Sequence, residues 1–201
     1  MLSNRLSYET TETCNVHNML KLSRHLFKWN ASAEVADFYE RALFNQILSS
    51  QHPIDGRVIY NLSLEMGHFK MFEDPNGFTC CIGTGMENHS KYAANIYFHN
   101  SDVLYVSQFI ASELNWKEKG VTVKQSTLYP EEQGTRFEIE TEKSTEFTLK
   151  IRHPYWLSAG ELKVFVNGKK VSVKQDPESF YDISRTWNTG DIVKVEMPFS
   201  L

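Results

Sequence analysis

The sequence has 201 residues, of which 41% are hydrophobic and 13% aromatic, so it can bury the core of one large or two small domains. The formal net charge of −4, without a sustained basic stretch, argues against a nucleic-acid partner. No apolar run is long enough to span a membrane, and the N-terminus lacks the basic-then-apolar form of a signal peptide. The compartment stays open between cytoplasm and periplasm.

Two amphipathic helices are predicted near the start of the chain. Residues 12–29 carry apolar side chains at helical spacing, with lysine, arginine and histidine between them. After a short break at residues 30–32, residues 34–48 repeat the pattern. A strand is expected at residues 58–64, and a second extended piece at residues 69–72.

A cysteine pair, Cys80-Cys81, follows the polar turn of residues 73–77. Gly83 and Gly85 come just after the pair, and we expect them to adopt positive φ in a further turn. A third helix is predicted from Met86 to about Ile96. The two thiols would then lie near a helix N-terminus, where the helix dipole favours thiolate over thiol.

After residue 100 the chain changes to short β-branched or alternating runs, separated by turn residues. The expected strands cover residues 103–110, 121–127, 136–142, 146–152, 162–166, 169–174, 181–183 and 192–197. The sequence Asn167-Gly168 between two apolar runs is the clearest hairpin turn. We therefore predict an α+β, multidomain protein, with a helical domain at residues 1–100 and an antiparallel β-sandwich at residues 101–201.

All three cysteines lie in two places: Cys14, and the pair Cys80-Cys81. Free cysteines are often small buried side chains without chemistry, which is one interpretation of all three. A disulfide framework is a poorer fit, because the number is odd and two of the residues are adjacent. The third interpretation is a metal site, in which Cys14, Cys80, Cys81 and Glu12 offer Zn²⁺ three sulfurs and one oxygen. The spacing matches no zinc-finger pattern, so the residues alone leave these alternatives open.

Several motifs together resemble one enzyme family. They are Glu12-Thr13-Cys14, residues 39–45 (Tyr-Glu-Arg-Ala-Leu-Phe-Asn), the cysteine pair, residues 152–156 (Arg-His-Pro-Tyr-Trp) and residues 185–191 (Arg-Thr-Trp-Asn-Thr-Gly-Asp). With these motifs, essentially the whole chain resembles glycoside hydrolase family 127, the β-L-arabinofuranosidases, and its close relatives. The resemblance implies a catalytic (α/α)6 barrel followed by β-sandwich domains, with a carbohydrate, such as a plant-derived arabinoside, as substrate.

The resemblance also implies a zinc ion held by one glutamate and three cysteines. The residues that match these ligands are Glu12, Cys14, Cys80 and Cys81. Cys80 further matches the nucleophile of a retaining mechanism, in place of the carboxylate that most retaining glycosidases use. Zinc suits this chemistry, because it keeps a thiol deprotonated near neutral pH and holds the sulfur when it leaves.

Glu40 and Tyr60 match positions that contact the sugar in the family. Without the resemblance, Glu40 would be a solvated helix carboxylate and Tyr60 a packing residue with its hydroxyl at the surface. The histidines form no tight metal spacing and are interpreted as surface or satisfied core residues.

The spacing of apolar residues predicts three helices in this chain, whereas an (α/α)6 barrel needs about a dozen. The resemblance also places the family's general acid/base upstream of Glu12, beyond the residues present here. We therefore expect the C-terminal part of a barrel plus one sandwich, which alone is weakly active or inactive. A partial barrel would expose apolar residues such as Val35, Phe38 and Leu43, which favours a homo-oligomer. The alternative function is a non-catalytic β-sandwich that binds carbohydrate or a protein partner, with a structural zinc.

Overall fold

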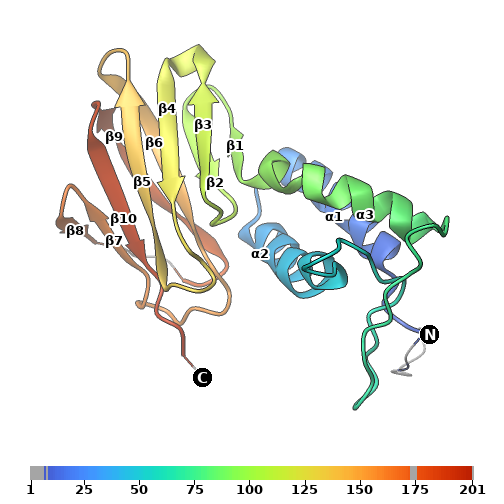
Figure 1. Cartoon of the computed structure of the whole chain (residues 1–201). Coiled ribbons are helices and arrows are strands. Elements are labelled where there is room, and N and C mark those ends of the chain that lie inside the picture. The colour runs from blue at the N-terminus through green and yellow to red at the C-terminus, as the bar shows by residue number, and fades with distance from the viewer. Residues whose placement is uncertain (1–6, 8, 173–175, 201) are drawn as a thin grey trace. The chain divides into compact units, whose positions relative to one another are not determined.

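The computed structural model describes residues 7, 9–172 and 176–200 of the chain (Figure 1). The chain divides into two compact units. The helical unit comprises Met1–Ala31 and Phe38–Tyr92, and the sandwich unit comprises Ser32–Asp37 and Ala93–Leu201. The domain limits expected from the sequence, 1–100 and 101–201, stay a prediction.

The helices follow the amphipathic pattern of the sequence. Their bounds are α1, Thr13–Trp29; α2, Ala33–Ala42; a π-helical turn, Leu43–Ile47; a 3-10 turn, Leu48–Ser50; α3, Cys80–Ser90; and a 3-10 turn, Tyr92–Asn95. The first two predicted helices are confirmed, although the second ends in π and 3-10 turns. In the helical unit, α1 packs along α3 (Figure 1).

The prediction for the third helix was wrong at both ends, because α3 begins at Cys80 and ends at Ser90. Thr79 caps the helix, and its hydroxyl accepts a hydrogen bond from the amide of Ile82 at 3.3 Å. Gly83 and Gly85 are helical residues and do not form a turn. Gly85 is required for a different reason: a Cβ there would lie 2.6 Å from Cγ1 of Val58.

The predicted strand at residues 58–64 forms only isolated bridges within the described part of the helical unit. They join Gln51 to Val58, Ile59 to Phe72, and Glu12 to Asn61. The last bridge brings this segment beside the start of α1. This segment therefore connects the start of α1 to the segments that contain Gln51 and Phe72.

The sandwich unit contains two sheets. The four-stranded sheet has the order β1-β2-β6-β9, and the six-stranded sheet the order β3-β4-β5-β10-β7-β8 (Figure 1). The strands are β1 Tyr97–His99, β2 Val103–Val106, β3 Ser112–Trp116, β4 Val121–Ser126, β5 Gly134–Thr141, β6 Thr145–His153, β7 Lys163–Val166, β8 Lys169–Val171, β9 Ser179–Trp187 and β10 Asp191–Glu196.

Each predicted run contains a strand, but the sequence did not indicate β1 or β3, which are short and not regularly apolar. The end of the predicted strand at residues 169–174 lies outside the described residues. The described strands pair mainly antiparallel, as predicted, and β2 pairs with β6 in parallel. The described helices do not amount to an (α/α)6 barrel, so that part of the fold prediction is not confirmed.

The core of the sandwich unit is aromatic and aliphatic, and its largest fully buried side chains include Trp116 and Trp187. Trp187 stacks on Phe147 and donates its indole N–H to the carbonyl of the same residue at 3.0 Å. The one polar atom of the tryptophan is thus satisfied within an apolar core.

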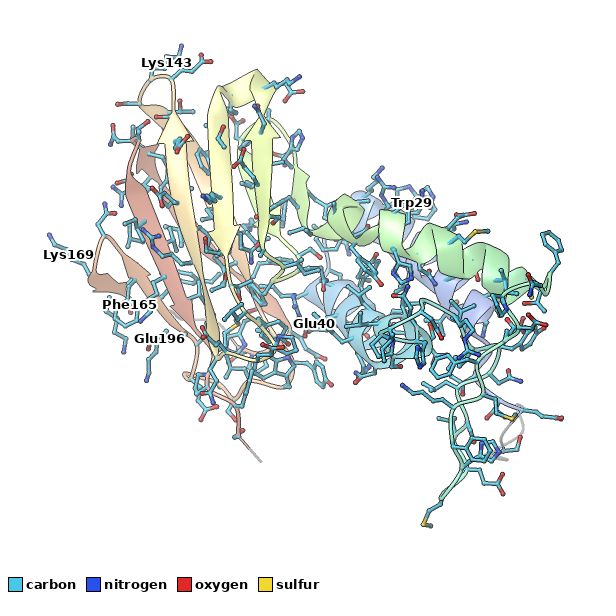
Figure 2. All side chains as sticks on the ribbon, viewed as in Figure 1. Trp29, Glu40, Lys143, Phe165, Lys169 and Glu196 are labelled. Carbon is cyan, nitrogen blue, oxygen red and sulfur yellow. The ribbon has the colours of Figure 1, made fainter. Side chains whose placement is uncertain are left out.

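Large apolar side chains of the helical unit are exposed on α1, at Met86 of α3 and along the segment from Leu48 to Phe78. Leu43 is buried, and Val35 and Phe38 are half-buried, so the expected exposure of Leu43 was wrong. Trp29, at the end of α1, is 79% exposed (Figure 2), and Met19, Leu22 and Leu26 are also exposed. Homo-oligomer formation stays a prediction. Among the described residues, no helix combines the length and apolar composition that a membrane span needs.

Candidate metal centre

Glu12 and Cys14 lie at the beginning of α1, where the backbone changes from an extended to a helical conformation. Glu12 is the N-cap residue with extended backbone, and Cys14 lies in the first turn. Thr13, between them, is fully buried and donates from its amide and hydroxyl to the carbonyl of Tyr60, at 3.0 and 3.1 Å. These hydrogen bonds fix the backbone at Thr13, and the side chains of Glu12 and Cys14 on either side of it point toward each other.

Cys80 and Cys81 are the first two residues of α3. Thr79, which caps the helix, also donates its hydroxyl to Oε2 of Glu73 at 2.8 Å. The cap therefore ties the start of α3 to the preceding turn. As predicted, the thiols lie at a helix N-terminus, where the helix dipole favours negative charge on sulfur.

The two helix starts bring four donor atoms together. The Cys14 thiol donates to Oε1 of Glu12 at 2.6 Å, and the Cys80 thiol lies 3.4 Å from the same oxygen. The sulfurs of Cys14 and Cys80 are 3.5 Å apart. One donor atom from each of Glu12, Cys14, Cys80 and Cys81 lies within 4.8 Å of all the others. Residues far apart in sequence thus form one compact cluster.

The three cysteines differ in accessibility: Cys81 is buried, Cys14 is half-buried and Cys80 is exposed. Cys80 is therefore the thiol in the cluster that a substrate or reagent reaches most easily. Tyr60 lies beside it, with its hydroxyl oxygen 3.7 Å from the Cys80 sulfur. The backbone carbonyl of Tyr60 also accepts from the Cys81 thiol at 3.7 Å.

The charges in the cluster are coupled through hydrogen bonds. The thiols of Cys14 and Cys80 donate to Glu12 and hold the pKa of its carboxyl below the usual range. The same carboxylate raises the pKa of Cys14, whereas burial raises the pKa of Cys81. The nearby Cys80 and Glu12 raise the pKa of the Tyr60 phenol, which stays protonated. Without a cation, the thiols of Cys14 and Cys81 therefore keep their protons, whereas the Glu12 carboxyl is ionised.

The donor set can be tested against the zinc that the family resemblance implies. Tetrahedral Zn²⁺ with Zn–S bonds of about 2.3 Å needs sulfurs about 3.8 Å apart. The 3.5 Å between Cys14 and Cys80 is close to that separation. Three sulfurs and one carboxylate oxygen are ligands that thiophilic divalent metals accept. The residues present therefore fit a metal of this class.

Among the predicted sugar-contacting residues, Tyr60 lies at the cluster, whereas Glu40 lies on α2. The side chain of Glu40 is buried, so it is not the solvated helix carboxylate that the sequence allowed. Thr13, Thr79 and Glu73 support the cluster and were not predicted. A threonine before a helix is an N-cap signal, but the predicted start at Met86 hid it.

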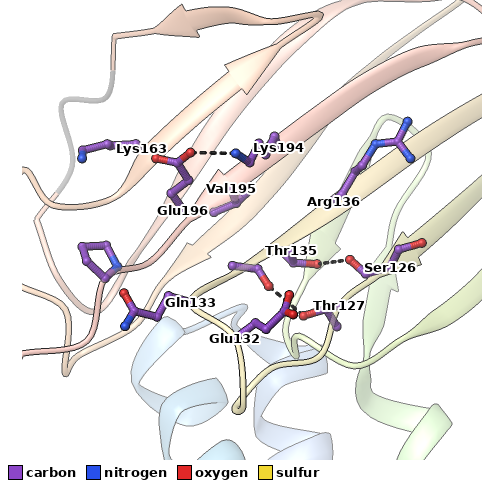
Figure 3. Close-up of a pocket in the computed structure, with 12 residues that line it drawn as sticks. Ser126, Thr127, Glu132, Gln133, Thr135, Arg136, Lys163, Lys194, Val195 and Glu196 are labelled. Carbon is purple, nitrogen blue, oxygen red and sulfur yellow. Dashed lines mark hydrogen bonds and ion pairs between the residues drawn. The ribbon is translucent and has the colours of Figure 1, made fainter.

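Two pockets are lined by residues outside the four-residue cluster. In the helical unit, a pocket of about 250 Å³ lies along α3 and is lined by residues that include Asp55, Glu73 and His89. In the sandwich unit, an open groove of about 490 Å³ is lined by hydroxyl and charged side chains (Figure 3). None of the residues predicted to bind metal or sugar lines either pocket.

Comparison with known families assigns both parts of the chain. Residues 1–94 match the family model described as the catalytic domain of GH127 β-L-arabinofuranosidase, and residues 103–199 match that of the GH127 middle domain. These matches define the class of protein as the glycoside hydrolases. The chain belongs to glycoside hydrolase family 127. No match was found among curated protein sequences.

Solved structures agree with this assignment. A GH127 β-L-arabinofuranosidase from Geobacillus stearothermophilus T6, Ara127N-Se, aligns with a TM-score of 0.81 and 27% identity over 96% of this chain. A structure described as a glycoside hydrolase aligns with a TM-score of 0.78 and 25% identity over 93% of the chain. The GH127 β-arabinofuranosidase BT3674 shares the fold, with a TM-score of 0.79 and 23% identity over 96%. The chain spans 32–33% of the length of these structures.

Proposed function

We propose that this chain carries the metal ligands and the nucleophile of a retaining β-L-arabinofuranosidase that acts on plant-derived arabinosides. The observation that carries the proposal is the cluster of Glu12, Cys14, Cys80 and Cys81, in which the most exposed sulfur belongs to Cys80. Membership of family 127 supports glycoside hydrolysis as the reaction. Glu40 and Tyr60 are proposed to contact the sugar.

In the proposed reaction, the sulfur of Cys80 attacks the anomeric carbon and forms a C–S bond. The bond from that carbon to the leaving oxygen breaks, and its electron pair passes to the oxygen, which takes a proton from a general acid. Water then attacks the same carbon and gives a proton to the conjugate base of the general acid, and the sulfur leaves with the electron pair of the C–S bond. This sequence of two displacements retains the configuration of the sugar.

The residues of the cluster have separate tasks in this scheme. Zn²⁺ bound to the four ligands would keep the sulfurs deprotonated and stabilise the leaving sulfur. Cys81 is buried and holds its place in the cluster, whereas Cys80 is open to the sugar. Tyr60, with its hydroxyl 3.7 Å from the Cys80 sulfur, can donate a hydrogen bond to that sulfur or to a sugar oxygen. The general acid is proposed to lie upstream in a longer protein, so we expect this chain alone to be weakly active or inactive.

Elemental analysis of the purified chain, combined with mass-spectrometric mapping of alkylated cysteines, tests the proposal. We expect about one zinc per chain, with Cys80 alkylated faster than Cys14 and Cys81 while the metal is bound. After chelation the preference for Cys80 should diminish. A chain with no metal and three equally reactive cysteines would contradict the metal-held nucleophile. Efficient arabinoside hydrolysis by the 201-residue chain would contradict the assignment of the acid to an upstream segment.

A second candidate function is carbohydrate binding by the sandwich unit. The groove of Figure 3 favours it, because its hydroxyls and charges of both signs can hydrogen-bond to sugars. They belong to Ser126, Thr127, Glu132, Thr135, Arg136, Lys163, Lys194 and Glu196. Calorimetric titration with arabino-oligosaccharides should detect binding that Arg136→Ala weakens. Lys143→Ala, a charge change outside the groove, is the matched control. Equal binding by both variants would exclude the groove.

A further inference from the structure

Thr11, the residue just before Glu12, has a backbone conformation that its side chain disfavours. Its φ is +62°, in the left-handed region, and it is a β-branched residue. Of the described residues other than glycine, only Asn167 and Glu178 also have positive φ, and Asn167 belongs to a hairpin turn that commonly requires it. Such a conformation persists only where the surrounding structure imposes it, and such sites cluster at functional centres.

Two hydrogen bonds hold Thr11 in this conformation, and both end on its carbonyl oxygen. The amide of Leu62 donates to it at 3.2 Å. The side-chain amide of Gln46 donates to it at 2.9 Å. Gln46 is buried, with 6% of its surface exposed, so this bond is shielded from competing water.

Gln46 comes from the π-helical turn of residues Leu43–Ile47, directly after α2. A π turn inserts one residue into a helix and changes which side chains face inward, and it is frequent at functional sites. Here Gln46 and Ile47 are buried, whereas Asn45 is exposed. The turn therefore directs the Gln46 amide to Thr11.

The direction of the backbone at Thr11 decides where Glu12 points. Glu12 continues from Thr11 in an extended conformation, pairs with Asn61 and then begins α1. From this position its Oε1 reaches the sulfurs of Cys14 and Cys80, at 2.6 and 3.4 Å. A Thr11 residue relaxed to negative φ would send the chain into Glu12 along a different path.

We propose that Gln46 is a positioning residue: it holds Thr11 in the left-handed conformation and thereby holds the Glu12 carboxylate among the three sulfurs. The proposal rests on the proposed function, in which Glu12 is a metal ligand. Gln46 itself does not touch the metal or the substrate.

Titration of the full 201-residue chain with Co²⁺, followed by visible absorption, tests this role. Gln46→Met keeps the length of the side chain and removes the donor. We expect it to weaken Co²⁺ binding about tenfold, as changes behind metal ligands commonly do, and to shift the spectrum because the carboxylate ligand is displaced. Gln108→Met is the matched control, because Gln108 is also buried and donates to a backbone carbonyl, that of Ala36. It should leave the cobalt spectrum unchanged.

Substitutions of Thr11 provide a rescue of the Gln46→Met variant and a second test of the proposed role of Gln46. Glycine adopts positive φ readily, so Thr11→Gly added to Gln46→Met should restore most of the affinity and the native spectrum. Thr11→Pro fixes φ near −65° and should weaken binding even with Gln46 in place, whereas Thr11→Gly alone should not. If Gln46→Met does not fold, which circular dichroism would show, the comparison of Thr11→Pro with Thr11→Gly still tests whether metal binding needs the positive φ of Thr11.

The outcomes separate the two proposals. A native chain that takes up no cobalt refutes the metal site and with it the role of Gln46. A native chain that binds cobalt, together with unchanged binding by Gln46→Met or by Thr11→Pro, refutes the role of Gln46 alone. Failure of Thr11→Gly to restore binding in a folded Gln46→Met variant refutes it as well.

Discussion

Cys14 and Cys80 are 66 residues apart in the sequence, and their sulfurs lie 3.5 Å apart at the starts of two helices. Here α1 and α3 must both form and pack before the sulfurs meet. Metal binding should therefore be coupled to folding of the helical unit.

The first prediction concerns protons released on metal binding. A hydrogen bond to Glu12 raises the pKa of Cys14, and burial raises the pKa of Cys81, so both thiols are protonated near neutral pH without metal. Metal ligands must be deprotonated, so binding should release about two protons from these residues. The apparent affinity should consequently rise with pH. Proton release measured in weakly buffered solution, beside zinc competition titrations at about pH 6 to 8, checks both statements.

Cys14→Ser is the informative variant for this prediction. It removes one ionisable ligand, so zinc binding should weaken and proton release should fall by about one. Zinc affinity that does not change with pH in the native chain would contradict the proton-linked site.

The strands of the sandwich could be predicted well from the sequence, because each strand has a local pattern of alternating apolar and polar side chains bounded by turn residues. Val121–Ser126 and Asp191–Glu196 are examples in which buried and exposed residues alternate. β1 has only three residues, and the parallel pairing of β2 with β6 depends on contacts between distant segments. Neither feature leaves a local pattern that periodicity can detect.

The candidate site was predictable only in part. The types of ligand were visible in Glu12, Cys14 and the cysteine pair, and the family resemblance joined them into one site. The residues that position the ligands could not be predicted, because each of them forms its hydrogen bond with a residue distant in the sequence. Thr13 bonds to Tyr60, and Gln46 bonds to Thr11. The glycines after the pair suggested a turn, whereas Gly85 serves the close approach of α3 to Val58.

The two glycines of α3 provide a second prediction. A Cβ at Gly85 would lie 2.6 Å from Cγ1 of Val58, so Gly85→Ala should force α3 and the residue 58 segment apart and cost about 1–3 kcal/mol. A Cβ added at Gly83 would meet no neighbouring atom within 4 Å, so Gly83→Ala should stabilise the helix by about 0.5–1 kcal/mol. Hydrogen exchange of the α3 amides measures both changes. Equal effects of the two substitutions would contradict the steric argument.

A third prediction concerns the buried ion pair between Arg152 and Asp37 in the sandwich unit. Arg152 is fully buried, and it also donates from Nε to the carbonyl of Ser107 at 2.7 Å. Asp37→Ala would remove a buried carboxylate that pairs with this guanidinium and should cost about 3–5 kcal/mol. The double variant Arg152→Met with Asp37→Leu should recover part of that loss, because it removes both charges of this pair.

Lys150 and Asp182 form the matched surface pair, 2.7 Å apart on neighbouring strands of the same unit. Asp182→Ala should cost at most about 1 kcal/mol, since water screens this pair. Urea denaturation followed by tryptophan fluorescence compares the two pairs. A loss in Asp37→Ala no larger than that in Asp182→Ala would show that the buried pair is not a major stabilising contact.

The last prediction is a pH dependence of the stability of the sandwich unit. His153, at the end of β6, is fully buried, and burial lowers its pKa. Its Nδ1 lies 3.2 Å from the carbonyl of Pro154, to which the neutral ring can donate. In the unfolded chain, histidine binds a proton below about pH 6.5, so the unfolded state then holds more protons than the folded state. The free energy of unfolding should therefore fall as the pH is lowered through this value and rise as the pH is raised. Denaturation at about pH 7.5 and 5.5 should show a smaller decrease in His153→Gln than in the native chain, whatever the variant's stability at the higher pH. An identical decrease in both proteins would assign the pH dependence to other groups.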